Sequence, residues 1–307
     1  MERYALSNEI MMARLAIPSQ NPLPVFIDTD TSNEIDDPFA IVYALLSPEI
    51  DACGIASAPF RHEKSRNPAG GIEKSCRRIK EILSLLGKTG VPVHKGASSF
   101  LFSSEAPVLS EASEAIASAA RRQPPDEPLY VVSIGALTNI ASALLTDSRI
   151  IDKIVVIWLG GHAFHWPDTK EFNLLQDQSA FETVMASGVP LMIVPCFGAA
   201  SHLQTTLPEI REHVLPCGKL GQFLYDIYVK CSSDHFGYAR VLWDMAPFAF
   251  LANPEWTLHR LAHCPRLTRD LRWSTHDKTR LVRYIYHIDR NAVFTDLFRK
   301  IRRFSGS

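Results

Sequence analysis

The order of its apolar and amphipathic segments restricts the fold of this chain more than any other feature. Apolar runs typical of β-strands occur at residues 25–27, 52–56, 91–94, 129–134, 154–159 and 191–195. A segment with helical character follows each of them, at residues 39–46, 73–86, 110–120, 140–145, 178–187 and 220–229. This repeated strand–helix order predicts an α/β fold with an open, mostly parallel, Rossmann-like sheet and helices on both faces.

The two ends of the chain are expected to differ in role. Residues 1–24 form an N-terminal lead-in, with a short helix at 10–15 that we expect to pack on the sheet edge. Residues 25–307 are expected to form a single domain, because a chain of 307 residues can bury one large core. Beyond residue 230 we predict helices at 244–251 and 291–304 and a strand at 279–285.

Five carboxylates stand between the first apolar run and its helix: Asp28, Asp30, Glu34, Asp36 and Asp37. Carboxylates this close repel one another unless a cation, a shared proton or solvent relieves them, and a hard metal ion is the simplest remedy. A helix cap would use only one side chain, Asp36 or Asp37, and would leave Asp28 and Asp30 unexplained. In an open parallel sheet, ligands bind outside the carboxyl ends of the strands, which is where this loop would lie.

Composition excludes some classes of function. Lys and Arg number 32 against 33 Asp and Glu, and no long basic run offers a footprint for nucleic acid. No apolar run is long enough to span a membrane, and no N-terminal segment reads as a secretory leader. The six cysteines have no Cys-x-x-Cys spacing that would suggest zinc. We therefore expect a protein of the reducing cytoplasm that binds neither nucleic acid nor membrane.

The acidic loop resembles the signature of the inosine-uridine preferring nucleoside hydrolases, in which a strand runs into Asp-x-Asp and then into an Asp-Asp pair that opens a helix. Three later segments also resemble motifs of that family: residues 135–141 (GALTNIA), residues 171–173 (EFN) and Trp243–Asp244. Each segment alone is weak, and their joint occurrence in family order is strong. Thr31 to Ile35 lengthens the acidic loop relative to the common family form, which indicates a divergent branch.

The resemblance implies the nucleoside hydrolase fold and calcium-dependent hydrolysis of the N-glycosidic bond of a small riboside, releasing ribose and the base. Oxygen donors alone suit calcium better than zinc. By resemblance the metal ligands are Asp30, Asp37, Asp244 and the main-chain carbonyl of Thr138, and Asp30 is also the catalytic base. Asp36, Glu171 and Asn173 would hold the sugar hydroxyls, and Asp28 would support the loop from behind. A homodimer or homotetramer is expected by analogy.

Two positions depart from the family pattern. Trp243 stands where the family has a His that protonates the leaving base, and Trp has no acidic proton to give. The Asn after the second strand is also replaced, with Arg61 or His62 nearest, and His62 is counted among the substrate-binding residues. His162 and His165 are the leading candidates for a substitute acid, ahead of His62 and His235. Trp166 and Trp243 are candidates for stacking on a flat leaving group.

Two other functions fit parts of the sequence. Residues 26–31 also match the strand and Asp-x-Asp-x-Thr of haloacid dehalogenase-type phosphatases, where Asp28 would be the nucleophile and magnesium the ion. That alternative explains neither the Asp36–Asp37 pair nor Asp244. A nucleoside- or sugar-binding protein on the same scaffold would be expected to lack a metal ligand, and none is missing here.

Overall fold

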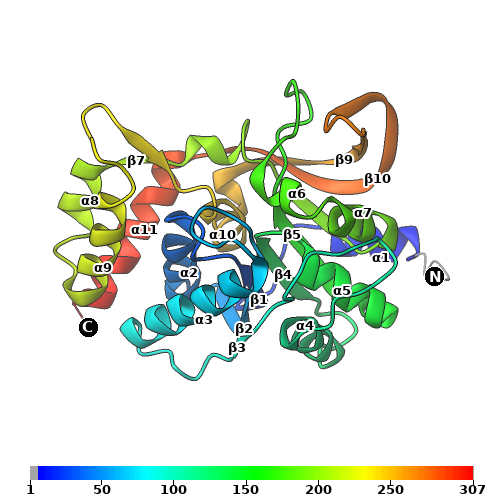
Figure 1. Ribbon diagram of the computed structural model, residues 1–307, viewed down its shortest axis with the longest axis horizontal. Coiled ribbons are helices and arrows are strands. Elements are labelled where there is room, and N and C mark those ends of the chain that lie inside the picture. Colours follow the sequence, from blue (N-terminus) through cyan, green and yellow to red (C-terminus); the bar gives the residue numbers. More distant parts are fainter. Residues whose placement is uncertain (1–5, 307) are drawn as a thin grey trace.

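The computed structural model describes residues 6–306, and at its centre lies an eight-stranded sheet (Figure 1). In spatial order the strands are β3 (Val93–His94), β2 (Ile50–Ser57), β1 (Leu23–Thr29), β4 (Leu129–Ile134), β5 (Ile154–Leu159), β6 (Leu191–Val194), β10 (Trp273–Ile288) and β9 (Thr257–Leu267). Neighbouring strands are parallel except at one edge, where β9 runs antiparallel to β10. The predicted open, mostly parallel α/β sheet is confirmed.

Helices cover both faces of the sheet, because successive residues of the central strands point into two different hydrophobic cores. In β1, Val25 and Ile27 belong to one core and Phe26 to the other. The first core includes residues of α2 (Asp36–Leu46), α3 (Pro68–Leu85), α8 (Leu207–His213), α9 (Gly218–Val229), α10 (Met245–Ala252) and α11 (Arg290–Ser305). The second includes α4 (Glu111–Arg121), α5 (Thr138–Thr146) and α7 (Gln178–Ser187), and Figure 1 shows the two groups on opposite sides of the strands. Within residues 6–306 no helix combines the length and the apolar character needed to cross a membrane.

The lead-in lies across the amino ends of several strands. Its helix, α1 (Asn8–Arg14), is followed by the buried Leu15, whose carbonyl accepts a hydrogen bond from Arg283 Nε at 2.5 Å. Arg14 Nε donates to the carbonyl of Asp152, just before β5, at 3.0 Å. The helix expected at residues 10–15 is therefore present, but it packs at the end of the strands that is opposite to the acidic loop.

Several elements differ from the prediction. β9 was not predicted, and β10 begins at Trp273, six residues before the predicted strand. Most side chains of β9 are exposed or half-buried, so this edge strand lacks the apolar run that marks the central strands. The short α6 (Phe172–Gln176) and the antiparallel pair of β7 (Gln204–Thr206) and β8 (Ala239–Val241) were also missed, because short elements carry too few residues to show a period.

The strand order creates a crevice beside β1. β1 and β4 are hydrogen-bonded neighbours, yet the chain leaves β1 toward α2 on one face and leaves β4 toward α5 on the other. Where two such connections diverge, an open α/β sheet has a natural ligand-binding crevice at the carboxyl ends of its strands. The acidic loop follows β1 and therefore lines this crevice.

Candidate active site

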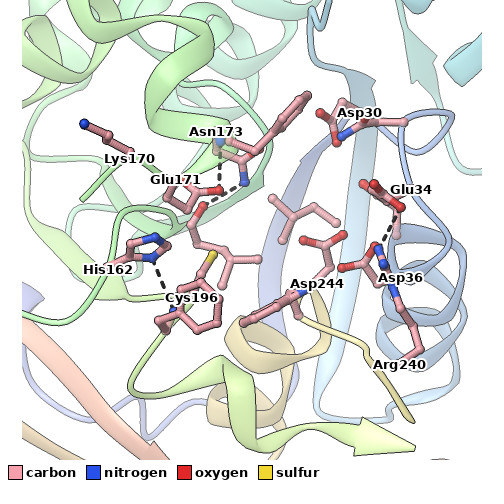
Figure 2. Close-up of a pocket in the computed structure, with 17 residues that line it drawn as sticks. Asp30, Glu34, Asp36, His162, Lys170, Glu171, Asn173, Cys196, Arg240 and Asp244 are labelled. Carbon is pink, nitrogen blue, oxygen red and sulfur yellow. Dashed lines mark hydrogen bonds and ion pairs between the residues drawn. The ribbon is translucent and has the colours of Figure 1, made fainter. Parts of the chain in front are cut away.

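A cavity of about 270 Å³ opens at the carboxyl ends of β1, β4, β5 and β6 (Figure 2). One side is acidic and is formed by the loop after β1 and the residue before α10: Asp30, Glu34, Asp36, Asp37 and Asp244. The other side comes mainly from the loops after β5 and β6: His162, Lys170, Glu171, Phe172, Asn173, Cys196 and Phe197. Segments more than 200 residues apart in sequence thus meet in one cavity.

The acidic side is a tight cluster. Asp36, Asp37 and Asp244 each place a carboxylate oxygen within 4.8 Å of the others. Thr29 Oγ1 donates a hydrogen bond to Asp37 Oδ1 at 2.5 Å. Asp36 and Asp37 begin α2, but the residue before it, Ile35, makes no side-chain cap, so helix capping does not explain the pair.

Burial controls the protonation of this cluster. Loss of solvent, together with the charge of the neighbouring Asp36, raises the pKa of Asp37 to about 8. Burial also raises the pKa of Asp36 to about 6, against the opposing effect of the Arg240 charge. The pKa values of Asp30 and Asp244 lie well above the ordinary range, because each is buried and faces the other carboxylates. Without a cation, the protein therefore holds protons in this cluster near neutral pH.

The cluster fits a hard divalent cation. Asp30 Oδ2 and Asp36 Oδ1 are buried and have no hydrogen-bond partner among residues 6–306. Such atoms are costly unless another group satisfies them. The available donors on this side of the cavity are oxygen atoms, which is the donor set that calcium or magnesium prefers and zinc does not.

Asp28 lies behind the cavity and does not line it. Its carboxylate accepts hydrogen bonds from Asn139 Nδ2 at 2.8 Å and from Ser133 Oγ at 3.4 Å. Asn139 in turn donates to the Ser57 carbonyl and accepts from the Ala97 N–H. The side chain of Asp28 is fully buried, and burial raises its pKa to about 7. This network ties the ends of β1, β2 and β4 together beneath the acidic loop.

The structure separates Thr138 from the cavity. Thr138 is the first residue of α5, and its hydroxyl donates to Asp177 Oδ2 at 2.7 Å. Inside a helix the carbonyl of a first-turn residue accepts the amide of the residue four positions later, so that carbonyl is engaged along α5. Ile134, the last residue of β4, does line the cavity.

Two of the side chains predicted to hold the sugar hydroxyls, Glu171 and Asn173, lie opposite the carboxylate cluster, and the third, Asp36, belongs to that cluster. Figure 2 shows Glu171 and Asn173 across the cavity from Asp36 and Asp244. The Glu171 carboxylate accepts the N–H groups of Gly161 at 2.9 Å, Asn173 at 2.8 Å and Leu174 at 3.0 Å, so it also caps α6. Asn173 Nδ2 donates to the Leu159 carbonyl at 3.0 Å. Gly161 has φ of +67°, which allows its N–H to turn toward Glu171.

Of the four candidate histidines, only His162 lines the cavity. Its Nδ1 accepts the Phe197 N–H at 3.5 Å, and burial lowers its pKa. His165 is exposed and outside the cavity. The His62 ring contacts the cavity residue Phe172 edge to face, with ring centroids 5.9 Å apart. The His235 ring stacks on Tyr228.

Aromatic rings form the wall next to His162. Phe197 lies parallel to Trp166, with ring centroids 5.5 Å apart, and meets Trp243 edge to face at 5.4 Å. Trp243 and Phe197 line the cavity, whereas Trp166 supports Phe197 from outside it. The sequence pattern identified both Trp residues but not Phe197, which no motif marked.

The match to known proteins agrees with this geometry. A family model described as inosine-uridine preferring nucleoside hydrolase matches residues 25–295. The chain belongs to this family.

Individual relatives support the assignment. The pyrimidine-specific ribonucleoside hydrolase RihA of Escherichia coli O1:K1 / APEC is 29% identical over 263 residues, which cover 76% of this chain and 80% of RihA. The plant nucleoside hydrolase PpNRh1 shares the fold with a TM-score of 0.74 and 21% identity over 92% of this chain and 99% of that one. The type III effector protein XopQ, solved in complex with adenosine diphosphate ribose, has a TM-score of 0.69 and 14% identity over 98% of this chain and 99% of its own.

The nucleoside hydrolase cavity of this chain contains an ion pair that sequence reasoning missed. Arg240 Nη2, on β8, lies 2.7 Å from Glu34 Oε2 in the lengthened part of the acidic loop. Figure 2 shows the pair beside Asp36, whose pKa the Arg240 charge lowers. The partners are 206 residues apart, so no local pattern could have linked them.

Proposed function

We propose that this protein is a calcium-dependent nucleoside N-ribohydrolase, which cleaves the bond between ribose and its base. Membership of the nucleoside hydrolase family supports N-glycosidic hydrolysis. The observation that carries the proposal for this chain is the placement of four buried carboxylates across one cavity from Glu171 and Asn173. Cleavage develops positive charge on the ribose ring, which nearby carboxylates stabilise. Release of free ribose from a panel of ribonucleosides tests the proposal, and turnover of none of them would contradict it.

We assign the metal to Asp30, Asp37 and Asp244, as the family motif implies. Asp37 and Asp244 belong to the tight cluster with Asp36, whereas Asp30 lines the same cavity outside that group of three. For the main-chain oxygen, the sequence motif pointed to Thr138, but the cavity lining favours the carbonyl of Ile134. A bound calcium ion supplies positive charge that orients a water molecule and lowers its pKa. Metal analysis of purified protein should find one calcium ion per chain, and protein that is active without any divalent ion would contradict the assignment.

Within this arrangement Asp30 is the base. Its Oδ2 is free of other hydrogen bonds, and its raised pKa makes the carboxylate a stronger proton acceptor than an exposed aspartate. Asp36, Glu171 and Asn173 would hold the ribose hydroxyls, because their polar atoms face the space between the two sides. Asp28 holds the loop in place through Asn139 without touching the substrate.

Ribose recognition gives the first prediction. Uridine should have a kcat/KM roughly 10³-fold or more above that of 2′-deoxyuridine, because a site built to hydrogen-bond a hydroxyl rejects the analogue that lacks it. Steady-state kinetics with both nucleosides measure the ratio. Asp36→Asn should lower this ratio of kcat/KM values, because the neutral amide oxygen of Asn accepts the hydroxyl hydrogen bond more weakly than the carboxylate does. Equal turnover of the two nucleosides would show that the sugar lies elsewhere.

The leaving group gives the second prediction. Because His162 Nδ1 accepts the Phe197 N–H, the neutral ring carries its hydrogen on Nε2, and this N–H can donate a hydrogen bond that stabilises the charge developing on the departing base. His162→Ala should therefore slow inosine and uridine by roughly 10²-fold. The same change should spare p-nitrophenyl riboside, whose phenolate leaves without a proton.

His165→Ala is the matched control, because His165 lies three residues away on the same loop but outside the cavity. It should leave both classes of substrate within about threefold of the unmodified protein, which is the range of a surface change. If His165→Ala slows natural nucleosides as much as His162→Ala, the assignment of the donor is wrong.

The structure argues against the phosphatase alternative. A haloacid dehalogenase-type mechanism needs Asp28 as an accessible nucleophile. Here Asp28 is fully buried, bonded to Asn139, and absent from the cavity wall. A phosphatase assay with magnesium should therefore give no turnover. A binding protein without activity is disfavoured because no predicted carboxylate ligand of the metal is missing.

We further propose a reducing, cytoplasmic location, because four of the six free thiols are buried as small core side chains. A homodimer or homotetramer stays a prediction, to be tested by light scattering.

A further inference from the structure

A second cavity, of about 410 Å³, lies on the other side of the lengthened acidic loop. We call it the basic cavity. Its lining includes the loop residues Thr31, Ser32 and Glu34, together with Lys64, Arg78 and Lys230 from three separate segments. The last three come from the loop after β2, from α3 and from the end of α9. Nothing in the nucleoside hydrolase mechanism above uses these cations.

The charge balance of the basic cavity is positive. Among the described residues that line it, Glu34 is the sole carboxylate, and Glu34 is already paired with Arg240 at 2.7 Å. Lys64 Nζ donates to the Asn33 carbonyl at 2.7 Å, which fixes the ammonium against the loop without neutralising it. Arg78 contacts Glu81 at 3.0 Å on the exposed surface of α3. Arg78 is therefore paired, as Glu34 is, and the positive charge that favours an anion in this cavity comes from Lys64 and Lys230.

A buried hydroxyl adds a second, independent indication. Thr31 is only 1% exposed, lines the basic cavity, and its Oγ1 has no hydrogen-bond partner among residues 6–306. A buried hydroxyl without a partner is costly, so a ligand atom that accepts its proton would be stabilising. Ammonium, guanidinium and hydroxyl donors together match the acceptor oxygens of a phosphate.

The basic cavity borders the reaction cavity directly. Glu34 lines both, and the loop from Thr31 to Asp37 forms the partition between them. Because Glu34 lines both cavities, a ligand with its ribose in the reaction cavity would reach Lys64 and Lys230 by passing over the Glu34 side chain. We infer that the basic cavity binds a phosphate group of a phosphorylated ribosyl substrate whose ribose occupies the reaction cavity. The placement of the ribose in the reaction cavity rests on the proposed function, whereas the phosphate site does not.

Titration of inorganic phosphate tests the anion site without any turnover. Calorimetry at low ionic strength should detect binding to the metal-loaded protein, and the double variant Lys64→Gln/Lys230→Gln should weaken it by about tenfold or more. Lys219→Gln is the matched control, because Lys219 is an exposed cation at the opposite end of α9 and does not line the cavity. Absence of binding, or equal binding by the double variant and the control, would overturn the inference.

Kinetics distinguish a substrate phosphate from a separate anion. With uridine 5′-monophosphate or adenosine diphosphate ribose, the double variant should raise KM by about tenfold, while uridine itself is unaffected. Inorganic phosphate should also compete with the phosphorylated compound. Phosphate that binds at Lys64 and Lys230 without competing would be a separate anion and would overturn the inference.

Failure of the proposed function has a different signature. If no riboside is cleaved, the competition is measured by calorimetry between inorganic phosphate and adenosine diphosphate ribose. If the double variant then binds adenosine diphosphate ribose more weakly and Lys219→Gln does not, the phosphate site is supported and the hydrolase assignment is wrong.

Discussion

Asp30→Asn is expected to lower kcat for ribonucleosides by roughly 10³-fold or more, because the substitution removes the proposed base and a negative metal ligand together. The side chain keeps its size, so the change tests charge and basicity rather than packing. Glu105→Gln is the matched control, because it also removes one carboxylate but lies in an exposed loop away from the cavity. This variant should retain activity. Kinetics with uridine, together with metal analysis, measure the effect.

The same variant carries its own folding control. In the metal-free protein Asp30 is buried and faces other carboxylates, so Asn at this position should raise the melting temperature rather than lower it. Calcium should stabilise the unmodified protein strongly and the variant weakly. If the variant loses activity but is stabilised by calcium as fully as the unmodified protein, Asp30 is the base and is not a metal ligand. A fully active variant would refute both roles.

Metal-free protein should lose stability as the pH rises from 5 to 8. The pKa of Asp36 is raised to about 6 and that of Asp37 to about 8, chiefly by burial. A carboxyl group whose pKa is higher in the folded state binds its proton more tightly there. Its destabilising effect is absent below about pH 4 and is complete once the pH exceeds the folded pKa. The summed effect is on the order of several kcal/mol, at 1.36 kcal/mol for each pKa unit.

Calcium should reverse this dependence, since the ion binds ionised carboxylates and competes with their protons. The rise in melting temperature on replacing EGTA by calcium should therefore be much larger at pH 8 than at pH 5. Asp28 lies outside the cavity, and its pKa of about 7 affects the stability of the calcium-loaded and the metal-free protein alike. The difference in melting temperature between these two forms therefore reports on the carboxylate cluster. Asp37→Asn should weaken the pH dependence of the metal-free protein. A calcium effect that is equal at both pH values would contradict the assigned ligands.

Much of the fold followed from local sequence. The apolar runs of β1, β4 and β5, each followed by a helix, were sufficient to predict a parallel sheet, because strand and helix periodicities are properties of neighbouring residues. The edge strand β9 was missed because its side chains are mostly half-buried or exposed and form no apolar run. Its place in the sheet depends on pairing with β10, which no local pattern encodes.

For the site, the sequence by itself determined which residue types gather at the end of β1: five carboxylates within ten residues repel one another unless a cation, shared protons or solvent stabilises them. Only the tertiary structure decided which way individual side chains face. It placed His162 in the cavity and His165 outside, lined the cavity with Ile134 and not Thr138, and paired Glu34 with Arg240. Charge and periodicity are carried by adjacent residues, whereas the direction of a loop side chain is set by packing against segments that are distant in sequence.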